Sequence, residues 1–192
     1  MTVRDVVVPA DLRPALREVA ETGLAVVPGA VATASLPPLL TELATLRYRD
    51  PPEGAHPVTT LSDLAVLREW DGYPALARLR EELVAAVGRS VPEWRPGEIF
   101  VRRYRQGSAG MSPHQDGTRF RLLVATVSVL GSAEFFRHTR KGEVTARWPL
   151  APGDLVLLRG TGFGGSPADE RPYHSVGGPT GELRYSVAFR MP

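Results

Sequence analysis

The sequence predicts a mainly β fold, a sandwich or jelly roll, with helices packed on the outside of the sheet. From about residue 98 onward, short runs rich in Val, Leu, Phe and Tyr alternate with Gly and Pro turns. Before that point, apolar residues recur at helical spacing. A chain of 192 residues with 43% hydrophobic residues suffices for one domain with a substantial core. We therefore expect a single domain over residues 1–192, with a helical portion at 1–97 and a jelly-roll core at 98–192.

Three helices and one short strand are expected in the first half. The first helix covers residues 10–22, the segment LAVVPGA forms a short strand and turn, and a second helix runs from Leu36 to about Arg49. The clearest helix runs from Tyr73 to Val87, with an apolar stripe on one side and Gly88 placed to end it. The connection DPPEGAHPVTT lies between the last two helices.

Six extended runs are expected to form the core strands. They are EIFVRRYR, FRLLVATVSVL, AEFFRH, EVTARWPL, GDLVLLRG and ELRYSVAFR. Two glycine-rich loops, RQGSAG and GTGFGGSPADE, separate some of these runs. We expect both loops near one open end of the barrel, where loops commonly carry substrate contacts.

The triplet His114, Gln115, Asp116 predicts a metal site together with His174. On an extended strand, residues two apart point to the same side, so His114 and Asp116 can converge on one ion while Gln115 points away. Two imidazoles and one carboxylate give the facial triad of non-haem Fe(II) oxygenases, which leaves the opposite face of the ion open. The chain has no cysteine, which excludes disulfides and zinc–thiolate sites.

The last strand predicts an anion site beside this metal. Arg184, Ser186, Ala188 and Arg190 share one face at period two. Two inward arginines need an anion, and a guanidinium binds a carboxylate with two parallel hydrogen bonds. A dicarboxylic acid offers one carboxylate to the metal side and one to a more distant arginine, which suggests 2-oxoglutarate.

The pieces MSPHQD, PYHS and RYSVAFR resemble the AlkB-like branch of the Fe(II)/2-oxoglutarate-dependent dioxygenases. The resemblance covers the chain from about Glu98 to the C-terminus. It implies a double-stranded β-helix, a cupin-like jelly roll, with Fe(II) bound by His114, Asp116 and His174. It also implies an enzyme that uses 2-oxoglutarate and O2 to oxidise a C–H bond, with succinate and CO2 as co-products.

The same resemblance assigns residues to the co-substrate. Arg184 would hold the distal carboxylate of 2-oxoglutarate, and Arg190 would help at its keto-acid end. Tyr104 matches a tyrosine whose hydroxyl contacts 2-oxoglutarate, and Ser186 lies on the same face as the two arginines. Arg102 stands where the family often has an asparagine.

Departures from the repair enzymes favour a small substrate, such as an amino acid or an intermediate of specialised metabolism. The nucleotide-recognition lid looks shortened, because only about two dozen residues separate the second and third helices. Thr118 stands where the repair enzyme has an acidic base-reading residue, and Leu158 where it has a stacking tryptophan. Arg102, Arg119 or Arg121 near the mouth would then bind an acidic group of the substrate.

The alternative is oxidative dealkylation of nucleic acid. Trp70, Tyr73 and Trp94 would rebuild a base sandwich, and Arg102, Arg103 and Arg105 would contact phosphates. The competing interpretation of these residues is core aromatics and a solvated basic face. A net charge of +2 permits nucleic-acid binding without demanding it. A non-enzymatic binding module is a third possibility, disfavoured because such a module needs no intact triad.

Two further predictions concern the location of the protein and the histidines outside the metal site. The N-terminus lacks a long apolar stretch and no segment approaches the length of a membrane span, so we expect a cytoplasmic protein without membrane contact. His56 and His138 lack partners of the metal-ligand kind and are interpreted as surface histidines.

Overall fold

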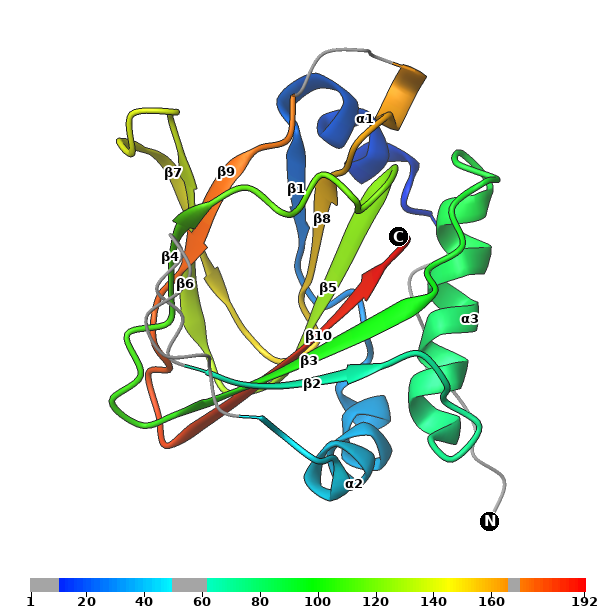
Figure 1. Cartoon of the computed structure of the whole chain (residues 1–192), viewed down its shortest axis with the longest axis vertical. Coiled ribbons are helices and arrows are strands. Elements are labelled where there is room, and N and C mark those ends of the chain that lie inside the picture. Colours follow the sequence, from blue (N-terminus) through cyan, green and yellow to red (C-terminus); the bar gives the residue numbers. More distant parts are fainter. Residues whose placement is uncertain (1–10, 50–61, 166–169) are drawn as a thin grey trace.

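The computed structural model describes residues 11–49, 62–165 and 170–192. Within these ranges two antiparallel sheets face each other, and helices pack on the larger one (Figure 1). In chain order the elements are α1 (Arg13–Thr22), β1 (Leu24–Val27), η1 (Thr33–Ser35), α2 (Leu36–Thr45), β2 (Asp63–Leu67), α3 (Pro74–Gly88), β3 (Glu98–Arg105), β4 (Met111–His114), β5 (Leu123–Leu130), β6 (Ala133–His138), β7 (Val144–Leu150), β8 (Leu155–Arg159), η2 (Phe163–Gly165), β9 (Tyr173–Val176) and β10 (Leu183–Arg190).

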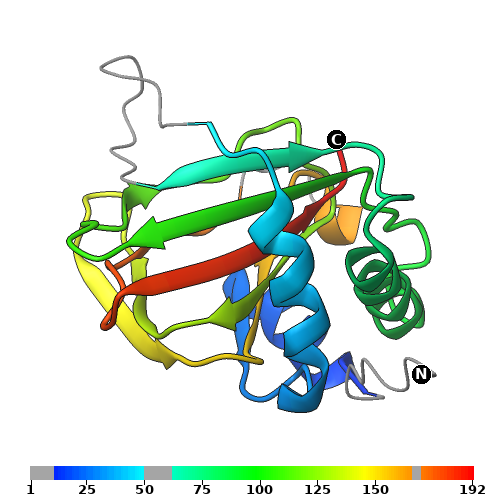
Figure 2. The same ribbon diagram turned by 90° about the horizontal axis from the view of Figure 1, so that it is seen from below.

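The larger sheet has six strands in the order β1-β8-β5-β10-β3-β2, and the smaller has four in the order β4-β9-β6-β7. Strand β10 lies between β3 and β5 and is antiparallel to both, with Arg184 opposite Tyr104 and Arg190 opposite Glu98. The helices lie on one side of the larger sheet and the smaller sheet lies on the other (Figures 1 and 2). This is a jelly roll, and it confirms the predicted fold class.

The larger sheet separates two hydrophobic cores, one on each of its faces. The outward side chains of the sheet pack with the helices, as Val187 and Phe189 of β10 and Leu76 of α3 do, all fully buried. The inward side chains, among them Phe100 and Ala188, form a second cluster that faces the smaller sheet. Period-two alternation therefore sends every second residue of β10 into the barrel, as predicted.

The helices differ from the predicted ranges at their ends. α1 begins at Arg13 and ends at Thr22, and the next residue, Gly23, has a φ of 91°, the left-handed conformation that glycine tolerates. α2 ends at Thr45 rather than near Arg49, because the backbone is extended at Leu46 and Arg49 pairs with Leu64 of β2. α3 begins at Pro74 and ends at Gly88, which is the last residue of the helix rather than the one after it.

Strand β2 was missed by the sequence interpretation, as were the short strands β4 and β9. β2 pairs with β3 at the edge of the larger sheet, and β1 forms the opposite edge. Both edge strands precede residue 98, so the larger sheet takes strands from either side of that position. The division into portions 1–97 and 98–192 stays a prediction, and the segment expected to be a short lid lies largely outside the described residues. Among the described helices, none is long and apolar enough to span a membrane.

Candidate active site

Two histidines from adjacent strands of the smaller sheet converge with an aspartate that follows one of these strands. His114 is the last residue of β4, and its register partner in β9 is His174. Asp116 follows two residues after the end of β4. The two imidazole rings lie 4.3 Å apart, and the possible ligand atoms of the three residues all lie within 4.8 Å of one another. The geometry thus brings together the three residues predicted to bind a metal.

Backbone carbonyls orient both histidines. Nδ1 of His114 lies 2.8 Å from the carbonyl of Ser112, and Nδ1 of His174 lies 3.1 Å from that of Pro172. A carbonyl only accepts, so each Nδ1 carries the proton and donates, which leaves Nε2 with a free lone pair for a metal. Burial, followed by the neighbouring His174, lowers the pKa of His114 to about 4. Burial also lowers the pKa of His174. Both rings are therefore neutral at physiological pH, as metal ligation requires.

One carboxylate oxygen of Asp116 has a hydrogen-bond partner, and the other has none among the described residues. Arg190 donates to Oδ1 at 2.9 Å, and the guanidinium carbon lies 4.4 and 4.6 Å from the ring centres of Phe100 and Phe120. Burial would raise the pKa of Asp116, but Arg190 and the two histidines outweigh it and lower the pKa. Oδ2 is buried with no hydrogen-bond partner in the described part of the chain. A buried, ionised oxygen without a partner fits a bound cation.

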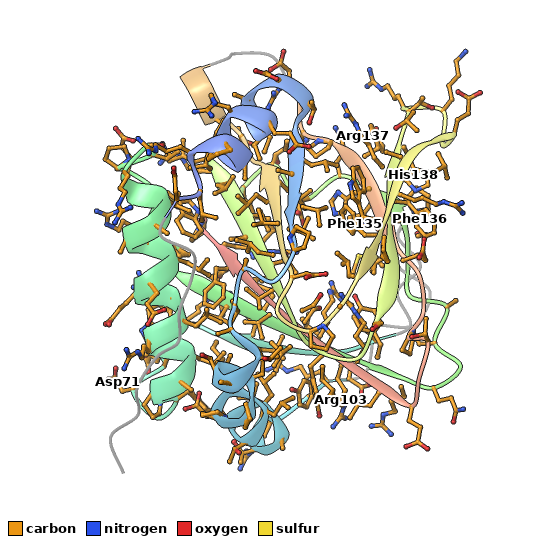
Figure 3. All side chains as sticks on the ribbon, turned by 180° about the vertical axis from the view of Figure 1, so that it is seen from behind. Asp71, Arg103, Phe135, Phe136, Arg137 and His138 are labelled. Carbon is orange, nitrogen blue, oxygen red and sulfur yellow. The ribbon has the colours of Figure 1, made fainter. Side chains whose placement is uncertain are left out.

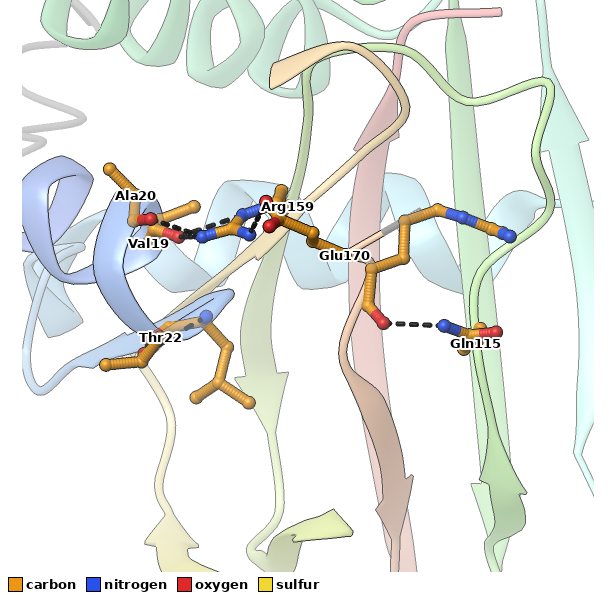
Figure 4. Close-up of polar contacts among 8 residues, drawn as sticks. Val19, Ala20, Thr22, Gln115, Arg159 and Glu170 are labelled. Atoms are coloured by element: carbon orange, nitrogen blue, oxygen red, sulfur yellow. Dashed lines mark hydrogen bonds and ion pairs between the residues drawn. The ribbon is translucent and has the colours of Figure 1, made fainter. Parts of the chain in front are cut away.

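Hydrogen bonds tie the segment around Asp116 to the segment before His174. Gln115 donates from its side chain to the carbonyl of Arg171 at 2.6 Å (Figure 4), and Arg171 donates to the carbonyl of Asp116. The side chain of Gln115 thus joins the two segments that carry the predicted metal ligands. These two bonds fix the segment that carries Asp116 relative to the segment that leads into His174.

Arg184 is a buried cation without an acidic partner. Its residue is 2% exposed, its Nη2 lies 3.3 Å from Ser128 Oγ, and its guanidinium lies 5.1 Å from the ring centre of Tyr104. Burial lowers the pKa of Arg184, and its Nε has no hydrogen-bond partner. No carboxylate among the described residues pairs with it. A carboxylate of a bound ligand would satisfy this group.

One cavity joins the triad to Arg184 between the two sheets. Its walls include all the residues predicted to contact metal or co-substrate, and they are mostly apolar elsewhere. The lining residues are Phe100, Arg102, Tyr104, Met111, His114, Asp116, Thr126, Phe135, Leu150, Val156, Leu158, His174, Val176, Arg184, Ser186, Ala188 and Arg190. The donor set and the cavity therefore fit both an iron ion and a dicarboxylic acid.

Of the five predicted substrate residues, Arg102 and Leu158 line the cavity and three do not. Thr118 is exposed and its carbonyl accepts a bond from Thr161. Arg119 pairs with Glu98 at 2.7 Å on the rim. Arg121 is exposed, and its backbone forms an isolated bridge with Thr161. The glycine-rich loop at 105–110, which joins the end of β3 to the start of β4, does not line the cavity, and its expected place near the open end of the barrel stays a prediction.

The aromatic and basic residues of the base-sandwich alternative lie elsewhere. Trp94 is fully buried in the helix-side core, where its Nε1 donates to the carbonyl of Leu123 at 2.7 Å. Trp70 and Tyr73 pack against that same core. Arg103 and Arg105, on the outer face of β3, both pair with Asp63. The interpretation as core aromatics is correct for this set, and the arginines do not form one basic face.

The third described histidine, His138, is not a free surface group. His138 is half-buried on β6, on the side of the molecule away from α3 (Figure 3). Its Nε2 lies 2.8 Å from Ser175 Oγ and its Nδ1 lies 3.0 Å from the carbonyl of Gly142. His56 lies outside the described residues.

Several cavity residues were missed by the sequence interpretation. Phe100 shares the inward face of β3 with Arg102 and Tyr104, so period two could have identified it. Phe135, which stacks on His174 with ring centres 5.7 Å apart, comes from the other sheet. Its place depends on the pairing of β6 with β9, for which the sequence has no local signal.

Comparisons with known proteins agree with this geometry. A family model described as "2OG-Fe(II) oxygenase superfamily" matches residues 56–190. No curated protein matches the chain. A prolyl-4-hydroxylase from Pseudomonas putida has a TM-score of 0.63 at 13% identity, with 94% of this chain and 99% of that chain covered. OsALKBH1 has a TM-score of 0.64 at 13% identity, with 88% and 98% covered.

A third solved structure is HygX from Streptomyces hygroscopicus with nickel and 2-oxoglutarate bound. It has a TM-score of 0.64 at 16% identity, with 93% of this chain and 85% of that chain covered. These likenesses concern the fold, whereas the family model matches well over half of the sequence. The chain belongs to the 2OG-Fe(II) oxygenase superfamily.

Proposed function

We propose that this oxygenase oxidises a C–H bond of a small molecule, an amino acid or an intermediate of specialised metabolism. Fe(II), 2-oxoglutarate and O2 are the reactants that its family uses, with succinate and CO2 as co-products. The observation that carries the proposal is the pair of unsatisfied groups in one cavity: Asp116 Oδ2 beside two histidines, and the guanidinium of Arg184. The first requires a cation and the second an anion.

The chain's own residues would divide the work as follows. His114, Asp116 and His174 would hold the iron on one face and leave the other face to ligands. Arg184 and Tyr104 would bind the distal carboxylate of 2-oxoglutarate, with Ser186 beside them and Arg190 at the keto-acid end. When bound, iron and 2-oxoglutarate would allow the enzyme to oxidise a C–H bond with O2. Apolar side chains such as Phe135 and Leu158 would exclude water and limit which bond of the substrate reaches the metal.

Three observations support a small substrate. Leu158 gives the cavity an aliphatic wall where a base-stacking ring would be needed. The aromatic residues that could have sandwiched a base are core residues. HygX, one of the neighbours in fold, has been solved with hygromycin B bound, so a barrel of this shape accepts a small molecule.

Oxidative dealkylation of nucleic acid is the second candidate. It is favoured by the resemblance of MSPHQD, PYHS and RYSVAFR to the AlkB-like branch, and OsALKBH1 is among the neighbours in fold. Membership of that branch, rather than of the superfamily, is part of this proposal. The cytoplasmic location likewise stays a prediction.

The test begins with anaerobic titration of the protein with Fe(II) and 2-oxoglutarate. We expect the weak visible metal-to-ligand charge-transfer band, and we expect His114→Ala, Asp116→Ala and His174→Ala to abolish it. His138→Gln is the matched control, because His138 lies outside the cavity and should leave the band unchanged. An unchanged band in the three variants would show that the site assignment is wrong.

The substrate class is then tested by succinate formation with two panels, alkylated oligonucleotides and amino acids with related acidic metabolites. Stimulation by the metabolites, with a product one oxygen heavier or two hydrogens lighter, supports the small-molecule proposal. Stimulation by methylated oligonucleotides with release of formaldehyde would establish the second candidate instead.

A further inference from the structure

Arg102 is an inward-facing cation of the candidate active site, and neither metal binding nor co-substrate binding as proposed above gives it a role. It lies on the inner face of β3, between Phe100 and Tyr104, and lines the cavity. Its Nη1 donates to Oγ of Ser62, a buried residue, at 3.0 Å. That bond fixes one end of the guanidinium, and a guanidinium has further N–H groups that can donate to another acceptor.

Its neighbours differ from Arg102 in having acidic partners. Four other arginines on β3, on β10 and at the rim each lie within 3.1 Å of a carboxylate oxygen: Arg103 and Arg105 with Asp63, Arg119 with Glu98, and Arg190 with Asp116. No carboxylate in the ranges 11–49, 62–165 and 170–192 pairs with Arg102. Arg184 is also without one, but a co-substrate carboxylate would satisfy it.

The charges of a loaded site leave Arg102 unbalanced. A loaded site would hold five positive charges, from the divalent ion, Arg184, Arg190 and Arg102, against three negative charges, from Asp116 and the two carboxylates of 2-oxoglutarate. Arg190 contacts Asp116 and Arg184 would contact the distal carboxylate, so no carboxylate is left for Arg102. Arg102 therefore has no counter-charge, although burial lowers its pKa and so disfavours an isolated charge there.

Arg102 lies nearer the metal end of the cavity than Arg184 does. Its register partner on β10 is Ser186, which lies between Arg184 and Arg190, and Arg190 contacts Asp116. An anion on Arg102 would consequently be held near the open face of the metal, where the substrate must present its C–H bond.

From this position and this missing partner we infer that Arg102 binds a carboxylate of the primary substrate, so that the enzyme acts on an organic acid. The inference rests on the function proposed above and narrows its substrate class. The planar guanidinium fork suits a carboxylate, and Ser62 holds that fork in place. Arg102 is then a specificity-determining residue, distinct from the arginine that holds the co-substrate.

The experiment uses acid and amide pairs as probes. The protein is loaded anaerobically with Fe(II) and 2-oxoglutarate and titrated with N-acetyl amino acids and with the primary amides of the same compounds, which have similar shape but no charge. Binding is followed by calorimetry and by the change in the charge-transfer band. We expect at least one acid to bind about 10- to 100-fold more tightly than its amide, as for a charge-assisted hydrogen bond.

Three variants test whether Arg102 causes the preference for the acid over the amide. Arg102→Gln should erase the difference between acid and amide, and Arg102→Lys should restore part of it. Arg119→Gln is the matched control, because that arginine lies on the rim with Glu98 as its partner and should keep the difference. The affinity of Arg102→Gln for 2-oxoglutarate should match that of the wild type.

Two results would overturn the inference while the proposed function stands. One is a wild-type protein that forms the Fe(II)/2-oxoglutarate band but prefers no acid over its amide. The other is a loss of 2-oxoglutarate affinity in Arg102→Gln as large as in Arg184→Gln, which would make Arg102 a co-substrate residue. Absence of the band in the wild type would instead refute the proposed function, and this inference with it.

Discussion

Arg190 holds Oδ1 of Asp116 at 2.9 Å and leaves Oδ2 without a partner among the described residues. The guanidinium therefore decides which oxygen is available to an ion. Because Arg190 lies over the rings of Phe100 and Phe120, its own position is fixed by packing. The carboxylate is thus oriented by the protein before any metal arrives.

Replacing Arg190 should destabilise the metal-free protein more than the metal-loaded protein. Arg190→Met keeps the packing against the aromatic rings but leaves Asp116 as an uncompensated buried carboxylate. We expect the free energy of unfolding to fall by about 3 kcal/mol in the presence of a chelator. Bound Mn(II) compensates the carboxylate and should reduce that loss. Urea unfolding with and without Mn(II) measures both values.

A double variant is the control for this prediction. In an Asp116→Asn background the charge to be compensated is absent, so Arg190→Met should cost much less. An equal cost in both backgrounds would mean that Arg190 stabilises the protein through its packing alone.

Removing the charge of Arg184 should stabilise the protein while ending co-substrate binding. Arg184 is buried, and no acid in the described ranges compensates it. Arg184→Met removes the cost of burying that charge, so we expect the free energy of unfolding without ligands to rise by about 1–2 kcal/mol. The affinity for 2-oxoglutarate should fall on the order of 100-fold. Chemical unfolding and calorimetry test the two halves of the prediction, and a destabilised Arg184→Met would contradict it.

Arg159 is buried like Arg184, but it has acceptors for its guanidinium, so replacing it should destabilise the protein. It is 8% exposed, donates to the carbonyls of Val19 and Ala20 at the end of α1, and pairs with Glu170 at 2.6 Å (Figure 4). A cation at a helix C-terminus also interacts favourably with the helix dipole. Arg159→Met leaves these acceptors unsatisfied, so we expect a loss of about 3 kcal/mol in a urea titration. A loss below about 1 kcal/mol would mean that water replaces the guanidinium there.

A methyl group at Gly131 should disturb the strand that carries Arg184. Gly131 has a φ of +70°, and a Cβ there would overlap the carbonyl of Leu183 and lie 3.1 Å from Cα of Arg184. Gly131→Ala should therefore lower the unfolding free energy by more than about 2 kcal/mol, since both the backbone and β10 must shift. Gly142→Ala is the control, because Gly142 has a φ of +90° but open space around it. It should cost only about 1 kcal/mol, and similar losses in both variants would contradict the steric argument.

The parts of the site that obey short-range rules could be predicted from the sequence. Period two placed Arg184, Ser186 and Arg190 on one face of a strand, and all three line the cavity. The spacing of His114 and Asp116 likewise predicted their convergence. These predictions needed only the geometry of an extended chain.

The parts that depend on pairing between distant segments could not be predicted. β2 is short, and only its pairing with β3 makes it a strand. Arg119 carries the same charge as Arg102 and was expected at the mouth with it. The difference arises because Glu98, 21 residues earlier, takes Arg119 as its partner on the rim.

The central position of β10 also has a consequence for biosynthesis. The strand lies between β3 and β5, yet it follows both in the chain, and it carries Arg184 and Arg190 together. A nascent chain that has not reached residue 190 therefore exposes two unpaired strand edges that should pair only when β10 fills the gap. The larger sheet therefore becomes continuous only after β10 has left the ribosome. Assembly of the catalytic chamber waits for this strand, and a chaperone that shields β3 and β5 would act before it.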